Sequence, residues 1–453
     1  MSGATAAHAS YNGSGTQGLA VTNKINDTGD IMSVFWTKDK TTKQLLHGCA
    51  LIEIPSSGGN TDQPGSSMTF TMNSDMDVIG DLYVHVKLTF GAVTEISKEY
   101  GLLNLFERIE FQCGTQIWQT LEFADILGLN TTELSEGGYE KFILSAGGFF
   151  DANGGVAAAT ANIGGPTDTD FETAADEVRN FSFRLPLLTR NLGPMLNNYS
   201  NISESGFLTA AAPNQTVKIK IYTNKTSVMV TNKMISASDA DDRMEVRLFG
   251  KHMIMCNEER EKIRSIPGGI AKRLKLTQYR DSILPAASGT SVTSIELDCD
   301  HFSLYASHLI IQIFDNTEYK KNDSYKMDAT LHDECTSLLS ADLKLNSTSF
   351  CGTLTGGMMA GPLPESMGLY VNNFFSRTDP HTRTIVYVFP LANKAYSGSG
   401  VPLNRFDNIR LSLKLHTPET VAGTKAIIRK VSATCVGETT ALYKQGAASI
   451  SMY

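Results

Sequence analysis

One short segment concentrates residue types that bind metals. His332, Asp333, Glu334 and Cys335 follow one another directly. On a strand or a loop, adjacent side chains point in different directions, and a tetrahedral site would need a second cluster of ligands to complete it. We therefore favour a solvated loop with one buried cysteine over a metal centre.

Two further segments are rich in carboxylates, the groups that Ca²⁺ prefers. Neither has the EF-hand spacing, which requires a central glycine and a distal glutamate. Solvated acidic loops are therefore the favoured interpretation, and we expect no metal. The residues are Asp168, Asp170 and Glu172 in one loop, and Asp239, Asp241 and Asp242 in the other.

Histidines that could act as general bases lack partners. His85 and His416 lie on the polar side of alternating segments, and neither has a serine or cysteine at a motif spacing. The sequence also lacks a GxxxxGK(S/T) phosphate loop, an HExxH pair, a GxSxG elbow and a CxxC pair. We predict no catalytic residues, no cofactor and no enzyme activity, with both histidines at the surface or in an interface.

A basic group follows the middle of the chain. Its members alternate with Leu274 and Leu276, which favours a solvated strand face over a binding patch. The whole chain has 39 Lys and Arg against 47 Asp and Glu, a formal charge of −8. Affinity for phosphate backbones requires clustered basic residues, so we expect no direct sequence-specific binding of nucleic acid. The group comprises Lys272, Arg273, Lys275 and Arg280.

The chain contains ten Asn-x-Ser/Thr sequons. A chain rich in asparagine, serine and threonine produces such sequons by chance. No basic segment followed by an apolar stretch begins the chain, so we expect no signal peptide. The seven cysteines are scattered, which indicates reduced, mostly buried thiols. The candidate glycosylation sites are Asn130, Asn198, Asn201, Asn214 and Asn346.

The elements that must position these residues are strands, because apolar and polar residues alternate in many segments. Each such segment buries one face and exposes the other, as antiparallel sheets require, whereas parallel sheets give continuous apolar runs. We predict an all-β antiparallel protein. The two clearest segments are Leu82–Phe90 and Ile409–Leu415.

Two helices are expected. Asn257–Arg264 has a capping residue, acidic residues first and basic residues last, and Pro267 ends it. A polar helix in the middle of an all-β chain is typical of a domain connector. Trp118–Leu127, stopped by Gly128, is the second predicted helix.

The two halves of the chain resemble each other in the order of their segments, which predicts an internal duplication of one β-sandwich. The predicted domains are an arm (1–27), a first sandwich (28–256), a connector helix (257–267) and a second sandwich (268–453). The matched segments are Val84–Phe90 with Leu309–Phe314, Glu107–Gly114 with Ala341–Asn346, Phe181–Leu187 with Ile385–Leu391, Val217–Thr223 with Ile409–Thr417, and Met244–Ile254 with Ala426–Val436.

These segments resemble the double jelly-roll major capsid proteins of nucleocytoplasmic large DNA viruses, of the algal-virus type. The proteins of Polinton-like elements and tailless phages are more distantly similar. Pro402–Leu415, with Asn404-Arg-Phe-Asp-Asn408, looks like a late family signature. Thr28–Trp36, Arg108–Trp118 and Glu245–Arg264 resemble further family segments in the same order.

The resemblance implies two tandem eight-stranded antiparallel jelly rolls with short connecting helices, and homotrimeric, pseudo-hexagonal capsomers that tile an icosahedral shell. The implied partners are neighbouring capsomers, minor capsid and penton proteins, and an internal membrane beneath the shell. The implied location is the virion, assembled in the host cytoplasm. The alternatives are a minor or penton-associated capsid protein of the same fold, or a carbohydrate-binding tandem β-sandwich, for which only Trp36 and Trp118 offer indole rings.

Overall fold

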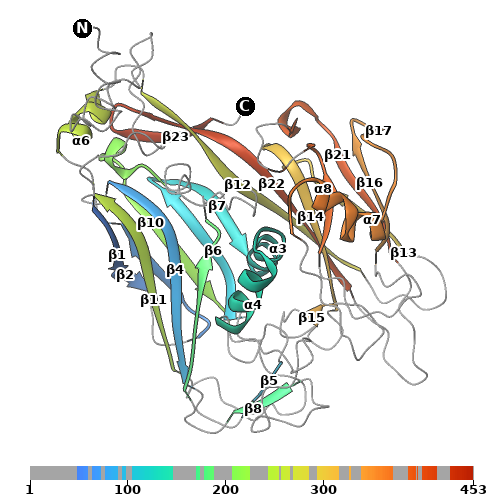
Figure 1. The fold of residues 1–453 in the computed structure, drawn as a ribbon, viewed down its shortest axis with the longest axis horizontal. Coiled ribbons are helices and arrows are strands. Elements are labelled where there is room, and N and C mark those ends of the chain that lie inside the picture. Colours follow the sequence, from blue (N-terminus) through green and yellow to red (C-terminus); the bar gives the residue numbers. More distant parts are fainter. Residues whose placement is uncertain are drawn as a thin grey trace.

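The fold was analysed in a computed structural model of the 453-residue chain, drawn in Figure 1. The described parts of the chain are residues 48–59, 64–72, 77–89, 94–97, 105–145, 170–173, 178–187, 207–224, 243–254, 257–265, 269–284, 293–315, 326–327, 338–370, 386–393, 395, 400–415 and 429–451.

The first half of the chain folds into two facing antiparallel sheets. The first, which we call sheet A, has the order β1-β11-β4-β9, and the second, sheet B, has the order β2-β3-β10-β6-β7. A small separate ribbon pairs β5 with β8. The strands are β1 (Gly48–Ile54), β2 (Ser56–Gly59), β3 (Ser67–Thr71), β4 (Val78–Thr89), β5 (Thr94–Ser97), β6 (Phe106–Cys113), β7 (Gln116–Glu122), β8 (Asp170–Thr173), β9 (Val178–Leu185), β10 (Val217–Thr223) and β11 (Arg243–Ile254).

The second half repeats this arrangement. Sheet C has the order β12-β22-β14, with β19, β20 and β15 paired to β14 and with β23 paired to β22. Sheet D has the order β13-β21-β16-β17, and β18 also pairs with β16. The strands are β12 (Ile270–Leu284), β13 (Thr293–Asp298), β14 (Tyr305–Asp315), β15 (Lys326–Met327), β16 (Leu338–Leu345), β17 (Thr348–Ser349), β18 (Leu354–Thr355), β19 (Tyr387–Pro390), β20 (Val401–Pro402), β21 (Ile409–Leu415), β22 (Arg429–Lys444) and β23 (Ala447–Ser451).

The helices are short and lie between strands. They are α3 (Phe123–Glu133), α4 (Glu136–Ser145), α6 (Asn257–Ser265), α7 (Gly356–Ala360) and α8 (Pro362–Ser366), with 3-10 turns η3 (Thr209–Ala211) and η5 (Leu403–Arg405). No helix in the described ranges is long and apolar enough to cross a membrane.

The two halves share one strand topology. The main strands of the first half are, in chain order, β1, β3, β4, β6, β7, β9, β10 and β11, and those of the second half are β12, β13, β14, β16, β17, β19, β21 and β22. When each set is counted from one to eight, sheets A and C have the order first, eighth, third, sixth. Sheets B and D have the order second, seventh, fourth, fifth. This order of eight antiparallel strands in two facing sheets is a jelly roll. The predicted all-β fold of two tandem jelly rolls is therefore confirmed, and we call the two units the first barrel and the second barrel.

Every segment match predicted from the sequence joins strands of equal rank. β4 and β14 are the third strands, and β6 and β16 are the fourth. β9 and β19 are the sixth strands, β10 and β21 the seventh, and β11 and β22 the eighth. The alternation that predicted these strands is visible in β10, where buried residues alternate with half-buried ones along its length. The predicted domain boundaries at 27/28, 256/257 and 267/268 fall at residues outside the described ranges, so these limits stay predictions.

The two helix predictions have different outcomes. The connector helix is confirmed as α6, which lies between the last strand of the first barrel and the first strand of the second. The helix predicted over Trp118–Leu127 is wrong in its limits, because Trp118 lies on β7 and α3 begins only at Phe123. Gly128 does not end this helix but lies in its middle, for a packing reason given below.

The buried apolar side chains of both barrels form one continuous cluster. Between the barrels the cluster is bridged by aromatic pairs, with ring centroids 5.4 Å apart for Phe207 and Tyr443 and 6.3 Å apart for Phe123 and Phe314. Because the core does not stop at the boundary, the contact between the barrels is part of the folded unit.

Candidate functional site: the contact between the two barrels

The contact between the barrels is formed by one helix and one strand of the first barrel against the outer face of sheet C. The helix α3 packs against β14 and β22, and β7 packs against β12 (Figure 1). Sheet C is therefore covered on both faces, by its own barrel core on one side and by the first barrel on the other. A strand buried on both faces must place some polar side chains out of water, and those need partners.

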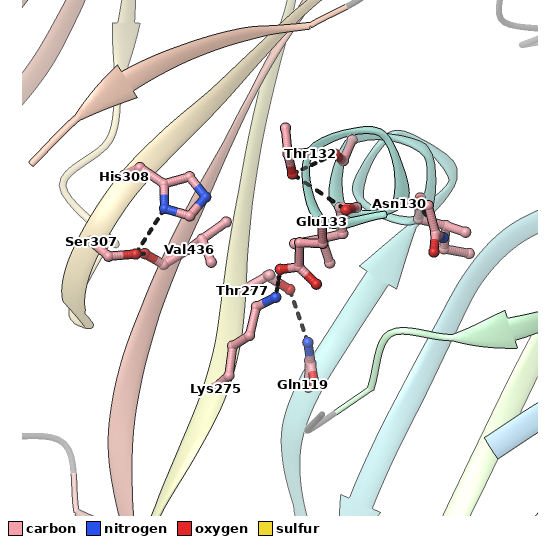
Figure 2. A network of polar contacts seen from close by, with 12 residues as sticks. Gln119, Asn130, Thr132, Glu133, Lys275, Thr277, Ser307, His308 and Val436 are labelled. Carbon is pink, nitrogen blue, oxygen red and sulfur yellow. Dashed lines mark hydrogen bonds and ion pairs between the residues drawn. The ribbon is translucent and has the colours of Figure 1, made fainter. Parts of the chain in front are cut away.

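The polar groups whose burial costs the most free energy form an ion pair across the contact. Lys275 on β12 meets Glu133 at the end of α3, and both side chains are almost completely buried (Figure 2). Burial lowers the pKa of the Lys275 ammonium well below its ordinary value, and the nearby Glu438 carboxylate opposes this shift. The prediction that Lys275 lies on a solvated strand face is therefore wrong, because α3 covers that face.

A second charged group lies on the first turn of α3. The Asp125 carboxylate accepts hydrogen bonds from the Glu122 backbone N–H at 2.9 Å and from the Thr434 hydroxyl of β22 at 2.6 Å. Burial raises the pKa of Asp125 to about 7, and these two hydrogen bonds oppose the shift. This residue therefore both caps α3 and ties it to the second barrel.

Neutral polar groups extend the same contact. The Gln119 amide of β7 donates to the Thr277 hydroxyl of β12 at 3.0 Å (Figure 2). On β14, the His308 ring contacts the Ser307 hydroxyl at 2.8 Å, and that hydroxyl donates to the Val436 carbonyl. Burial lowers the pKa of His308 to about 3. The imidazole is therefore neutral near pH 7.

Close approach of α3 to sheet C depends on a glycine. A Cβ at Gly128 would lie 3.0 Å from Ile310 Cγ2 and 3.2 Å from the Gln312 side-chain oxygen. The absence of a side chain lets the helix axis approach β14, which explains why a residue with poor helix propensity occupies the middle of α3.

A smaller contact joins the barrels at their other end. The Leu208 N–H donates to the Tyr443 hydroxyl at 3.3 Å, and the Ala448 N–H donates to the Gln215 side-chain oxygen at 2.7 Å. The Asn214 N–H donates to the Gly446 carbonyl at 3.0 Å. The hairpin of β22 and β23 is thereby fixed to the turn before β10.

Those of the other predicted acidic, histidine and basic site residues that the structure describes lie on three different strands, β8, β4 and β12. Asp170 and Glu172 lie on β8, a strand rather than the expected loop. His85 lies on the outer face of sheet A, with its Nδ1 2.7 Å from the Ser182 hydroxyl, and Arg280 is exposed on β12, which also carries Lys272 and Arg273. Outside the described residues lie Asp168, Asp239, Asp241, Asp242, His332, Asp333, Glu334, Cys335 and His416.

The candidate glycosylation sites differ in exposure. Asn130 is only 3% exposed, and its amide donates to the Ile126 carbonyl within α3, so the folded chain leaves no room for a glycan there. Asn214 and Asn346 are exposed, and glycans at these two positions stay a prediction. Asn198 and Asn201 lie outside the described residues.

The chemistry of the contact is structural. In the described part of the chain, no group of three or more histidine, cysteine, aspartate or glutamate side chains is arranged to hold a metal ion. Trp118 is only 5% exposed and packs against Phe111 and Phe207, so it offers no open ring to a sugar. The arrangement holds two barrels at a fixed relative orientation. Sequence reasoning missed it, because its two sequence signals, a lysine and a glycine among apolar neighbours, do not distinguish a covered strand face from an open one.

The fold and this contact define a double jelly-roll protein. The structure is similar to VP54 of the virus PBCV-1, with a TM-score of 0.66 and 14% identity over 92% of this chain and 99% of that chain. It is also similar to the major capsid protein of Faustovirus (TM-score 0.58, 9% identity, 92% and 94% covered). A chain of the Sputnik virophage gives a TM-score of 0.56 at 10% identity, with 94% and 91% covered.

These neighbours are viral double jelly-roll capsid proteins, so the fold that the sequence resemblance implied is confirmed. At these identities the likeness is one of fold. No protein-family model matches the chain, and no curated protein is similar to it in sequence.

Proposed function

We propose that this chain is a major capsid protein, a structural building block of an icosahedral viral shell and not an enzyme. The observation that carries the proposal is the pair of equivalent barrels, held side by side by a buried contact. Solved viral capsid proteins have a similar fold over 92% or more of this chain. A fixed pair of barrels is suited to tiling, because each chain presents two similar walls at a constant angle.

The proposed assembly is a homotrimer. Three chains place six similar barrels around one axis, so a particle with threefold symmetry has a nearly hexagonal outline. Hexagonal units can pack edge to edge in a shell. The proposed partners are therefore the other two chains, neighbouring capsomers, and the minor capsid and penton proteins that fill the remaining positions.

The proposed location is the virion, with assembly in the host cytoplasm and an internal membrane beneath the shell.

Closed shells assemble from many weak lateral contacts between stable capsomers. A stable trimer needs a larger buried area, on the order of 2,000–5,000 Å² for obligate interfaces. We therefore expect the trimer to form from purified chain alone and the shell to require further partners.

The experiment is expression of the full chain, followed by light scattering after size exclusion and by negative-stain microscopy. The expected result is a mass three times that of the 49.2 kDa chain and particles with a hexagonal outline. A strict monomer at micromolar to millimolar concentration would contradict the proposal.

Copy number distinguishes a major from a minor or penton-associated role. The major protein is the most abundant polypeptide in purified particles. A low copy number with the same fold would assign the chain to the vertices or to the layer beneath the shell. Binding to a glycan array by the monomer would instead favour the carbohydrate-binding alternative.

A further inference from the structure

One carboxyl group in the contact between the barrels is completely buried and receives its hydrogen bonds from neutral groups. Asp125, on the first turn of α3, is 0% exposed. Among the described residues its donors are the Glu122 backbone N–H of the first barrel and the Thr434 hydroxyl of the second. A carboxylate taken out of water is stable only when a cation compensates its charge, and otherwise it takes up a proton. Two neutral donors compensate the charge of Asp125 only in part.

The surroundings of Asp125 are acidic. Burial is the largest cause of its raised pKa, and the Glu122 and Asp281 carboxylates raise it further. Lys430 on β22 forms an ion pair with Asp281 on β12, with the Nζ 2.8 Å from the Oδ2. Burial also raises the pKa of Glu122, and Lys430 opposes that shift. Two carboxyl groups of the first barrel and one of the second therefore lie around a single lysine of sheet C at this end of α3.

The other charged groups around α3 act on other residues. Lys275 and Glu133 pair at the opposite end of the helix, and Lys275 acts on His308. Of the groups on β6, Arg108 and Glu107 act on Glu122. The charged and titratable groups of the elements around α3 also include Glu110 on β6, Tyr279 on β12, Glu438 on β22 and the exposed Lys141 on α4.

The two hydrogen bonds of Asp125 fit its charged and its neutral form. The Thr434 Oγ1 lies 2.6 Å from the Asp125 Oδ1, and a hydroxyl can donate or accept. When the carboxyl is charged, the Thr434 hydroxyl donates to it. When Oδ1 carries a proton, it donates to Thr434, and Oδ2 still accepts from the Glu122 N–H at 2.9 Å. The helix is therefore capped and tied to β22 in both forms.

We propose that the contact between the barrels is a pH-dependent latch, in which a proton taken up by Asp125 tightens the docking of α3 on sheet C. Protonation costs no hydrogen bond and removes a buried negative charge from acidic surroundings. Loss of the proton leaves a charge that water solvates only if α3 moves away from the sheet. The latch acts within one chain, so the inference does not depend on the proposed trimer.

The direction of the pH dependence follows from the two states of the carboxyl. In the docked state the pKa of Asp125 is raised from 3.8 to about 7. When α3 is released and the carboxyl reaches water, the pKa returns to its ordinary value. Between these two values the docked chain binds more protons than the released chain. Docking is therefore stabilised at low pH, and this stabilisation is lost as the pH rises through about 7.

The first test is Asp125→Asn in the full chain, because an amide has the shape of the neutral carboxyl group. Its oxygen accepts from the Glu122 N–H, and its NH₂ donates to the Thr434 hydroxyl. Native-state hydrogen exchange of the α3 amides, corrected for intrinsic rates, gives the opening constant of the helix at pH 6 and pH 8.5. We expect the ratio of the wild-type to the variant constant to rise about tenfold between these pH values. The ratio cancels groups that both chains share, Lys275 among them.

The matched control is Asp77→Asn. Asp77 is 1% exposed, but its carboxylate accepts two hydrogen bonds from the Arg260 guanidinium on α6, at 2.7 and 2.8 Å. A cation compensates this buried carboxylate. The corresponding ratio of opening constants for α6 should therefore have the same value at pH 6 and pH 8.5.

The second test is Thr434→Val, which leaves Asp125 in place. The Thr434 hydroxyl opposes the raised pKa of Asp125, so its removal should move the midpoint of the pH dependence of α3 opening to higher pH. A residue that only caps the helix gives no such movement. A wild-type to D125N ratio that stays constant between pH 6 and 8.5, or a T434V midpoint that stays in place or falls, overturns the inference. Because T434V keeps the carboxyl group, it decides the question even if D125N fails to fold.

Discussion

Sheets A and C have the same strand order, but their outer faces have opposite surroundings. Along β12, four consecutive residues from Leu274 to Thr277 are buried, so both faces of the strand are covered there. Along β4, buried residues alternate with half-buried or exposed ones from Leu82 to Thr89. Topology therefore does not decide which polar residues a strand must bury. The element that covers the strand decides it, and here that element comes from the other half of the chain.

The largest expected effect comes from breaking the buried pair on the covered face. In Lys275→Met, the Glu133 carboxylate keeps its buried position without the ammonium. Removing one member of a buried ion pair typically costs about 3–5 kcal/mol of the free energy of unfolding. Urea titration, combined with hydrogen exchange of residues 123–133, measures the loss and shows whether α3 is the part released.

The double variant Lys275→Met with Glu133→Leu is the control for this prediction. Replacing both charges with apolar groups of similar size removes the need for compensation, so we expect most of the lost stability to return. If the double variant were as unstable as the single one, the pair would matter through its shape rather than its charge.

The positions of many strands could be predicted from the sequence because strands that bury one face leave a period of two. β4, β10 and β21 were recognised in this way, and the polar helix α6 was recognised by its capping residues. The contact between the barrels could not be predicted, because Lys275 among leucines looks the same whether its face meets water or a helix. Gly128 was taken as a helix end for the same reason, since its partner Ile310 is remote in sequence.

A histidine in each barrel lies beside the register shift between the third and eighth strands, and the two differ in their partners. His252 on β11 is fully buried, and neither of its ring nitrogens has a hydrogen-bond partner in the described part of the chain, whereas His308 contacts Ser307. Burial lowers the pKa of His252 to about 4. Between pH 6.5 and 4 the unfolded chain therefore binds more protons than the folded chain at this residue, and stability falls as the pH falls.

We expect His252→Leu to remove this part of the acid sensitivity. When the pH is lowered from 7.5 to 5, the free energy of unfolding of the variant rises by about 2 kcal/mol relative to that of the wild type. The reason is that the buried histidine costs the wild type about 1.4 kcal/mol per pH unit below the ordinary pKa of histidine. Urea titrations at both pH values measure the gain, and the comparison at pH 7.5 corrects for any change in packing. A wild-type slope that persists in the variant would assign the acid sensitivity to other groups.

A matched pair of glycines sharpens the comparison of covered and open helix surfaces. Gly128→Leu forces a side chain against Ile310 and Gln312, and overpacking of this kind costs about 1–3 kcal/mol. Gly137→Leu, where a Cβ meets no atom within 4 Å, gains helix propensity and stabilises by up to about 1 kcal/mol. Thermal unfolding of the two variants should therefore shift in opposite directions, and equal shifts would mean that α3 can move away from sheet C.

The smallest loss of stability is expected when a charged side chain on the outer face of sheet A is removed. Arg247 and Glu245 on β11 form an ion pair at 2.5 Å, with side chains 49% and 46% exposed. Exposed pairs contribute little, so Arg247→Ala should leave the urea midpoint of the dilute, monomeric chain nearly unchanged. A loss close to that of Lys275→Met would mean that sheet A is already covered within one chain.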